Sequence, residues 1–123
     1  MTGNIDHPTH YNSRDIGYEC IDITQYQSFC IGNSIKYLWR YRDKGKPLED
    51  LEKARWYAYR ASTRQETVNL EDGHCTAILD RLIETTTGYE SALWYGLRKN
   101  NWLITLGALD VMIERLQNGV QTL

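Results

Sequence analysis

Apolar side chains recur at the spacing of an α-helix along most of this chain, and no other feature constrains the fold as strongly. The clearest stripe lies near the C-terminus, at Trp102, Leu106, Leu109, Ile113 and Leu116. Residues three, four and seven apart share one helical face, so this stripe predicts an amphipathic helix. The chain shows no strand-like alternation of apolar and polar residues and no repeat. We therefore predict an all-α fold.

Turn-forming residues divide the first half of the chain into an arm and three helices. Residues 1–17 contain Pro8 and several turn formers without apolar periodicity, which predicts an irregular N-terminal arm. Gly32 is expected to end the first helix, and Asn33 or Ser34 to cap the second. The predicted helices span residues 18–29, 33–43 and 47–67.

The third predicted helix carries small residues on one face. Three further helices are predicted to follow it. Leu51, Ala54, Ala58 and Ala61 form a narrow stripe that would let another helix approach closely. After a polar break at 69–73, the later helices are predicted to end near Thr85, Lys99 and Asn118.

These elements predict a single domain over residues 1–123. We divide it into the arm (1–17), a helical core (18–68) and C-terminal helices (74–118). Five or six helices form a small bundle, and we expect a second subunit to complete it as a homo-oligomer.

Composition excludes several classes of protein. A length of 123 residues with 41% apolar content suits one compact domain, and a net charge of −2 argues against coating of extended nucleic acid. No apolar stretch reaches 18 residues and no signal peptide is recognisable, so we expect a cytoplasmic protein that does not act in a membrane. The three cysteines form no C-x-x-C pair, which predicts reduced thiols and no disulfide.

Positive charge is concentrated in one segment. Residues 36–64 contain nine Lys or Arg against four Asp or Glu, whereas the rest of the chain contains five against twelve. Such segregation indicates an anionic ligand. Because the net charge is slightly negative, a small anion in a local pocket fits better than a polymer.

The first candidate binding set lies at the predicted start of the second helix. There Gly32 and a helix N-terminus would present free backbone N–H groups to a phosphate. The side chains that share a helical face with this end are Asn33, Lys36, Tyr37 and Arg40. The alternative is that Asn33 is only a cap and the two cations form a solvated face.

The second candidate set is a stripe of cations and aromatic rings on the third helix, made by Lys53, Trp56, Tyr57 and Arg60. Rings stack on bases while Lys and Arg pair with phosphates, so the set fits a nucleotide. Packing explains the rings as well, and for Trp56 a place in the core is the stronger interpretation.

The arm adds His7, His10 and Tyr11. The two histidines could be metal ligands, acid–base groups or polar contacts that fasten the arm over a pocket. Their spacing around Pro8 lacks the second ligand pair of a structural zinc site, so we expect no metal here and favour binding or docking. Tyr11 could close over a base or ribose, or anchor the arm.

Two acidic pairs allow a different chemistry. Glu19 and Asp22, and Glu49 and Glu52, are each one helical turn apart and could coordinate Mg²⁺, a spacing that resembles all-α nucleoside-triphosphate pyrophosphatases. Glu49 and Glu52 are explained better as first-turn charges that oppose the helix dipole. The sequence contains no Walker phosphate loop, no kinase-type glycine-rich loop and no G-x-S-x-G elbow.

Taken together, the motifs resemble a family of small phage-encoded proteins with the patterns H-P-x-H-Y, G-N-x-x-K-Y-x-x-R and D-L-x-K-A-x-W-Y. The resemblance covers residues 7 to about 60 and has no counterpart in the second half. The matching residues are His7, Pro8, His10, Tyr11, Gly17, Glu19, Asp22, Gly32, Asn33, Lys36, Tyr37, Arg40, Lys44, Gly45, Asp50, Leu51, Lys53, Ala54, Trp56 and Tyr57. Members are described as uncharacterised or as phage nucleotide kinases, so the resemblance implies work on nucleotides in an infected bacterium.

These observations lead to one principal hypothesis and three alternatives. The principal hypothesis is a nucleotide-binding protein without a cofactor that sequesters a nucleotide defence signal, cyclic or derived from ADP-ribose. The first alternative is an unorthodox Mg²⁺-dependent nucleotide kinase without a Walker loop. The others are the Mg²⁺-dependent pyrophosphatase and a module that binds a host protein through Trp94, Tyr95 and Trp102.

Overall fold

The computed structural model describes residues 14–120, and this part of the chain contains six α-helices and no strand. They are α2 (Ile21–Thr24), α3 (Phe29–Arg40), α4 (Pro47–Thr63), α5 (Cys75–Thr85), α6 (Gly88–Arg98) and α7 (Trp102–Gln117). The all-α fold is therefore confirmed. Between residues 14 and 120 no helix has the length and apolar character needed to cross a membrane. The single domain and the second subunit stay predictions.

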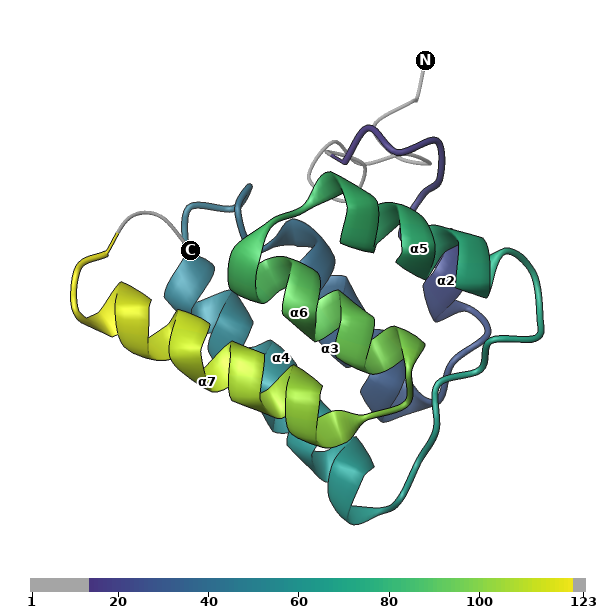
Figure 1. Cartoon of the computed structure of the whole chain (residues 1–123). Helices are drawn as coiled ribbons and strands as arrows, with labels where there is room; N and C mark the ends of the chain where they lie inside the picture. Colours follow the sequence, from purple (N-terminus) through teal and green to yellow (C-terminus); the bar gives the residue numbers. More distant parts are fainter. Residues whose placement is uncertain (1–13, 121–123) are drawn as a thin grey trace.

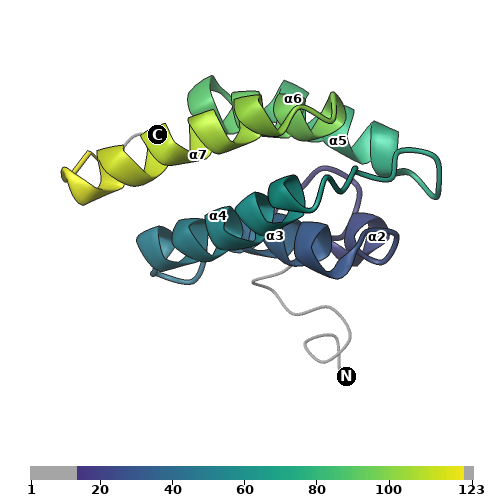
Figure 2. The same cartoon turned by 90° about the horizontal axis from the view of Figure 1, so that it is seen from below.

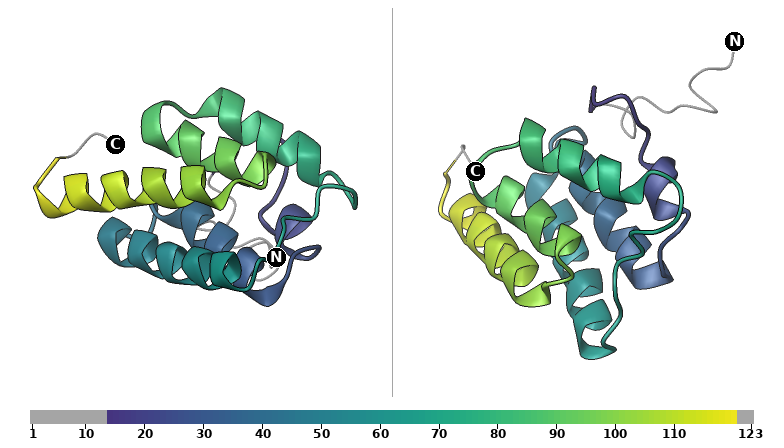
Figure 3. Two further views of the ribbon diagram at one scale, coloured as in Figure 1. Left: turned by 60° about the horizontal axis from the view of Figure 1, so that its bottom comes forward. Right: turned by 45° about the vertical axis from the view of Figure 1, so that its right-hand side comes forward.

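The helices lie in two layers (Figures 1 and 2). α2, α3 and α4 form the N-terminal layer, while α5, α6 and α7 form the C-terminal layer. The layers meet chiefly where α4 packs on α7, with a smaller contact between α2 and α5 (Figure 3). The predicted stripe of Leu51, Ala54, Ala58 and Ala61 is fully buried, because small side chains allow α4 to pack closely against its neighbours.

Close approach also fixes the pairing of α6 with α7. A Cβ atom at Gly96 would lie 2.7 Å from the backbone nitrogen of Thr105, so only glycine fits. The Thr105 hydroxyl donates a hydrogen bond of 3.0 Å to the Leu93 carbonyl oxygen and is fully buried. This contact replaces side-chain packing at a point where the backbones of the two helices lie close together.

The start of α3 corrects the predicted helix boundaries. The helix expected over residues 18–29 is reduced to the four residues of α2, and α3 begins at Phe29 rather than after Gly32. Its N-terminal cap is Ser28, whose Oγ accepts a hydrogen bond of 3.2 Å from the Ile31 amide. Gly32 lies within α3 and faces α2, where a Cβ atom would lie 3.4 Å from the Thr24 carbonyl oxygen.

The end of α4 also differs from the prediction, which placed it at Thr67. α4 ends at Thr63, and Gln65 adopts a positive φ of 56°. The Glu66 amide then donates 2.9 Å to the Ala61 carbonyl oxygen, and the Gln65 amide donates 3.0 Å to that of Ser62. This is the Schellman arrangement, which satisfies the last carbonyl groups of a helix and reverses the chain.

A buried carboxylate ties the two layers together. Glu90 on α6 is 1% exposed, and one of its oxygens lies 2.7 Å from Arg14 Nη2. It also accepts hydrogen bonds from the Tyr41 hydroxyl (2.7 Å), from Trp94 Nε1 (3.1 Å) and from the Arg42 guanidinium. Burial, together with the neighbouring Glu90 charge, raises the pKa of Tyr41, which keeps the phenol protonated as a donor.

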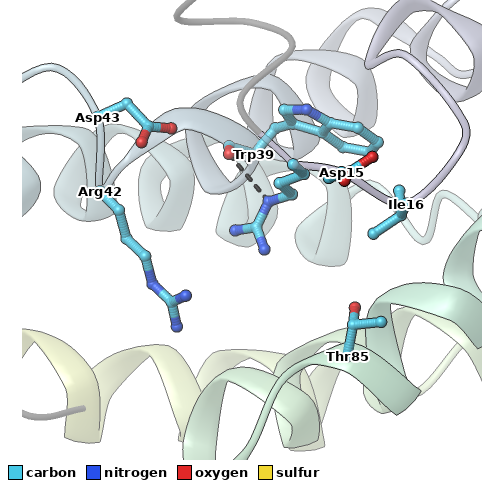
Figure 4. A pocket seen from close by; sticks show the side chains of 7 residues that line it. Asp15, Ile16, Trp39, Arg42, Asp43 and Thr85 are labelled. Carbon is cyan, nitrogen blue, oxygen red and sulfur yellow. Dashed lines mark hydrogen bonds between the residues drawn. The ribbon is translucent and has the colours of Figure 1, made fainter.

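An open hollow of about 310 Å³ lies beside this junction, between the end of α3 and the end of α5 (Figure 4). Arg42 reaches across it toward the C-terminal layer, with Thr85 on the opposite side. Arg14 donates hydrogen bonds of 2.9 Å to the Trp39 carbonyl oxygen and 3.0 Å to that of Leu38. Arg14 therefore closes the C-terminal end of α3 and pairs with Glu90 at the same time.

Replacement of Glu90 by alanine is expected to lower the free energy of unfolding by about 3–5 kcal/mol, because it leaves the Arg14 guanidinium, 11% exposed, without its carboxylate. Chemical denaturation followed by circular dichroism measures this change. Glu84→Ala, which removes an exposed carboxylate from the neighbouring α5, should change stability by less than about 0.5 kcal/mol. Equal effects of the two substitutions would contradict the assigned role of Glu90.

Candidate functional site

The candidate site is the outer face of the antiparallel pair formed by α3 and α4. The start of α3 meets the end of α4, where the Ser28 hydroxyl donates 2.6 Å to Glu66 Oε1. At the opposite end, Arg40 and Asp50 form an ion pair with Nε and Oδ2 3.9 Å apart. The surface shared by the two helices, which we call the groove, carries Lys36, Tyr37 and Arg40 from α3 and Lys53, Trp56, Tyr57 and Arg60 from α4.

Tyr37 is the centre of a cluster of cations and rings in this groove. Lys36 Nζ lies 4.6 Å, Arg40 Cζ 4.8 Å and Lys53 Nζ 5.5 Å from the centroid of its ring. The ring also stacks on that of Tyr57, with centroids 6.1 Å apart and planes 11° apart. The structure thus brings together five of the predicted site residues from two helices.

The cations of this cluster differ in exposure. Arg40 is only 7% exposed and pairs with the buried Asp50, so its first role is within the fold. Lys36 is half-buried, and Lys53 is exposed with a salt bridge of 3.6 Å to Glu49. Solvent reaches both lysines, and a ligand anion could therefore reach them too.

An open hollow of about 420 Å³ adjoins the cluster through Tyr57. Its lining consists of Ser28, Phe29, Cys30, Trp56, Tyr57, Arg60, Arg64 and Glu66. Phe29 is 75% exposed and Trp56 60% exposed, and both meet Tyr57 edge to face, with ring centroids 5.9 Å and 5.1 Å apart. The preference for Trp56 as a core residue is wrong, because the Ala stripe of α4 occupies the buried face instead. Two large rings held at the surface offer a stacking platform.

Other predicted residues lie elsewhere. Asn33 is within α3, where its side-chain Nδ2 donates a hydrogen bond of 2.8 Å to the Phe29 carbonyl oxygen. The predicted phosphate site on a helix N-terminus at Gly32–Ser34 therefore does not exist. Ser34 is buried and donates 2.9 Å to the Ala54 carbonyl oxygen. His7, His10 and Tyr11 lie outside the described residues.

Five residues that line the hollow were not among the predicted ligand residues, namely Ser28, Phe29, Cys30, Arg64 and Glu66. Phe29 was assigned to the end of the predicted helix 18–29 but begins α3, and Arg64 and Glu66 were assigned to a helix that ends at Thr63. The residues between Arg64 and Val68 are polar, and this was the available signal that the helix ends and the chain turns back.

The acidic pairs are engaged in local contacts. Asp22 Oδ2 accepts a hydrogen bond of 2.8 Å from the Glu19 amide, and Glu49 pairs with Lys46 and Lys53. Within residues 14–120 no three His, Cys, Asp or Glu side chains are grouped as ligands for a metal ion. The proposed host-binding surface also changes, because Trp94 is fully buried against Glu90.

Comparison with known proteins gives one match. A family model described as a protein of unknown function (DUF3310) matches residues 5–59, a little under half of the chain. This chain is thus similar to that family over α2, α3 and most of α4, which supply both walls of the groove. No curated protein and no solved structure matches the chain.

The three cysteines, which are free as predicted, provide a test of the hollow. Burial raises the pKa of the Cys20 thiol to about 12 and also raises that of Cys75, whereas Cys30 is half-buried and lines the hollow. Because the thiolate is the nucleophile, iodoacetamide at pH 8 should modify Cys30 first. Peptide mass spectrometry of the native and the unfolded protein measures the order. Modification of Cys20 before Cys30 would contradict this arrangement.

Substitutions of Arg40 and Lys36 should differ in their effect on the stability of the fold. Arg40→Ala leaves the buried Asp50 carboxylate without its cation, so the free energy of unfolding is expected to fall by about 3–5 kcal/mol. Lys36→Ala removes a solvent-accessible ammonium and should change stability by less than about 1 kcal/mol. Thermal unfolding of both variants checks the contrast, which fails if Lys36→Ala is the more destabilising substitution.

Proposed function

We propose that this protein captures a nucleotide in the groove between α3 and α4, with its base in the aromatic hollow and its phosphates against the lysines beside Tyr37. The observation that carries the proposal is the continuity of the two surfaces through Tyr57, which stacks on Tyr37 and also lines the hollow. Rings that stack a base and cations that pair with phosphate are the two parts of nucleotide recognition.

The dimensions of the groove support this proposal. Lys53 and Arg60 are seven residues apart on α4, which corresponds to about 10 Å along the helix. A nucleotide in an extended conformation can span such a distance from its base to its phosphates. The hollow of about 420 Å³ lies within the range of small-molecule sites, roughly 300–1,000 Å³.

Charge favours an anion over a neutral ligand in the same place. Lys36, Arg40 and Lys53 surround one ring, and their mutual repulsion is offset by Glu49 and Asp50. A bound phosphate would relieve more of this repulsion in a site partly shielded from solvent.

Capture of the nucleotide without turnover requires fewer components of the groove than catalysis does. Binding needs only the rings and cations described above, whereas phosphoryl transfer also needs in-line positioning of a second substrate and Mg²⁺. The resemblance to small phage-encoded proteins extends the proposal to an infected bacterial cytoplasm. There, capture of a cyclic or ADP-ribose-derived nucleotide would remove a defence signal.

The test is equilibrium binding to a panel of nucleoside mono-, di- and triphosphates, cyclic nucleotides and ADP-ribose derivatives. Lys36→Ala and Lys53→Ala should each weaken binding of the best ligand by about 1–3 kcal/mol, because each removes a charge-assisted contact. Lys99→Ala is the matched control, since Lys99 caps the C-terminal end of α6, away from the groove, with its Nζ 5.7 Å from the centroid of the Tyr95 ring. The ligand should also protect Cys30 from alkylation.

Recovery of the ligand separates capture from catalysis. Ligand released unchanged after heat denaturation supports sequestration, whereas multiple turnovers to a phosphorylated product in the presence of Mg²⁺ would establish the kinase alternative. Equal affinity of the Lys36→Ala, Lys53→Ala and Lys99→Ala proteins would remove the groove as the site.

A further inference from the structure

We infer that the Glu66 carboxylate makes the aromatic hollow selective for the base guanine. The ligand of the groove is then a guanine nucleotide. This inference rests on the proposed function and assigns its base specificity. It also assigns a binding role to a residue outside the segment 5–59 that matches the family model.

Glu66 is held in place by its backbone and by its side chain. The Schellman turn at Gln65 fixes its amide, and Trp102 Nε1 donates 2.8 Å to its carbonyl oxygen from α7. Its carboxylate accepts 2.6 Å from the Ser28 hydroxyl through Oε1 and 3.0 Å from Arg64 Nε through Oε2. Glu66 is one of the residues that line the hollow, and its side chain is 20% exposed. Because the carboxylate is already anchored, it loses little further conformational entropy when it binds a ligand.

The count of hydrogen bonds leaves capacity for a ligand. An ionised carboxylate has about four acceptor positions on its two oxygens, and Ser28 and Arg64 use one on each oxygen. One position remains on Oε1 and one on Oε2. A ligand with two parallel N–H donors could use both positions, as arginine does in its paired hydrogen bonds with a carboxylate.

Among the common bases, guanine presents such an edge, with its N1–H next to the 2-amino group. Adenine and cytosine place an amino donor next to a ring acceptor, and uracil and thymine place one N–H between two carbonyl groups. Each of these bases would direct at least one acceptor at the Glu66 carboxylate. An acceptor on the base that faces the carboxylate leaves both groups unpaired and repelling each other. In a partly desolvated site this contact discriminates strongly against these bases.

The remaining lining residues agree with this assignment. Phe29 and Trp56 provide exposed rings on which a purine can stack. Arg60 lines the same hollow, and arginine is the side chain that most commonly donates to guanine O6 and N7. Donors and acceptors of the hollow are thus both matched by one base.

The experiment compares GMP with IMP, which lacks only the 2-amino group, by isothermal titration calorimetry of the full-length protein. The wild-type protein is expected to bind GMP about 10–100-fold more tightly than IMP, because IMP loses one hydrogen bond to an ionised carboxylate. AMP and CMP should bind at least as weakly as IMP. Glu66→Gln, which replaces one acceptor with a donor, should bring the ratio of GMP to IMP affinity close to one. Glu71→Gln, in the same connecting segment but exposed, should leave that ratio unchanged.

The outcomes separate this inference from the proposed function. Equal affinity for GMP, IMP and AMP in the wild-type protein would overturn guanine selectivity while the nucleotide site stands. Absence of binding to any nucleotide would overturn both. A GMP preference that persists in Glu66→Gln would assign the selectivity to another residue. If Glu66→Gln does not fold, the comparison of GMP with IMP in the wild-type protein decides the question alone.

Discussion

The buried carboxylate of Glu90 is the interaction on which the arrangement of the two layers depends. A charge removed from water is tolerated only if every partner is in place, because the desolvation cost is several kcal/mol. Arg14, Tyr41 and Arg42 approach it from the N-terminal layer, and Trp94 from its own helix. Since these contacts are directional, they allow one relative position of the layers, whereas apolar packing between α4 and α7 alone would tolerate several.

This constraint determines which face of α4 remains available. Leu51 and the three alanines of the stripe are committed to the interior, so Lys53, Tyr57 and Arg60 lie on the side toward α3 and solvent. α3 runs antiparallel beside them and contributes Phe29, Lys36 and Tyr37. The groove is therefore a consequence of how α4 is buried, and one helix serves the core and the candidate site with opposite faces.

The groove also depends on the segment that connects the layers. After the Schellman turn at Gln65 the chain crosses the start of α3, and Asn100 then holds it by accepting 2.6 Å from the Val68 amide. A residue that follows α4 in sequence thereby becomes part of the wall of the hollow. A positive φ at a residue other than glycine is costly, and here it places Glu66 beside Ser28 and Arg64.

Residue types and their spacing along the chain were sufficient to predict the fold class and the chemistry of the α3–α4 face. Helical periodicity located five of the six helices to within a few residues, and the concentration of Lys and Arg in residues 36–64 pointed to the cluster around Tyr37. Both signals are local, since they depend only on residue types and their spacing along one helix. The small-residue stripe of α4 was identified for the same reason.

Packing between helices sets where α3 begins, which rings are exposed and which distant residues meet. Ser28 and Ser34 are equally good caps by type, but Ser28 caps α3 while Ser34 is buried against α4 and donates to the Ala54 carbonyl oxygen. Trp56 and Trp94 are indistinguishable as aromatic residues on helices, yet one lies at the surface and the other lies beside Glu90. Glu66 and Glu90 obtain their roles from partners about 40 and 50 residues away in the chain, and such contacts depend on the packing of whole helices rather than on local spacing.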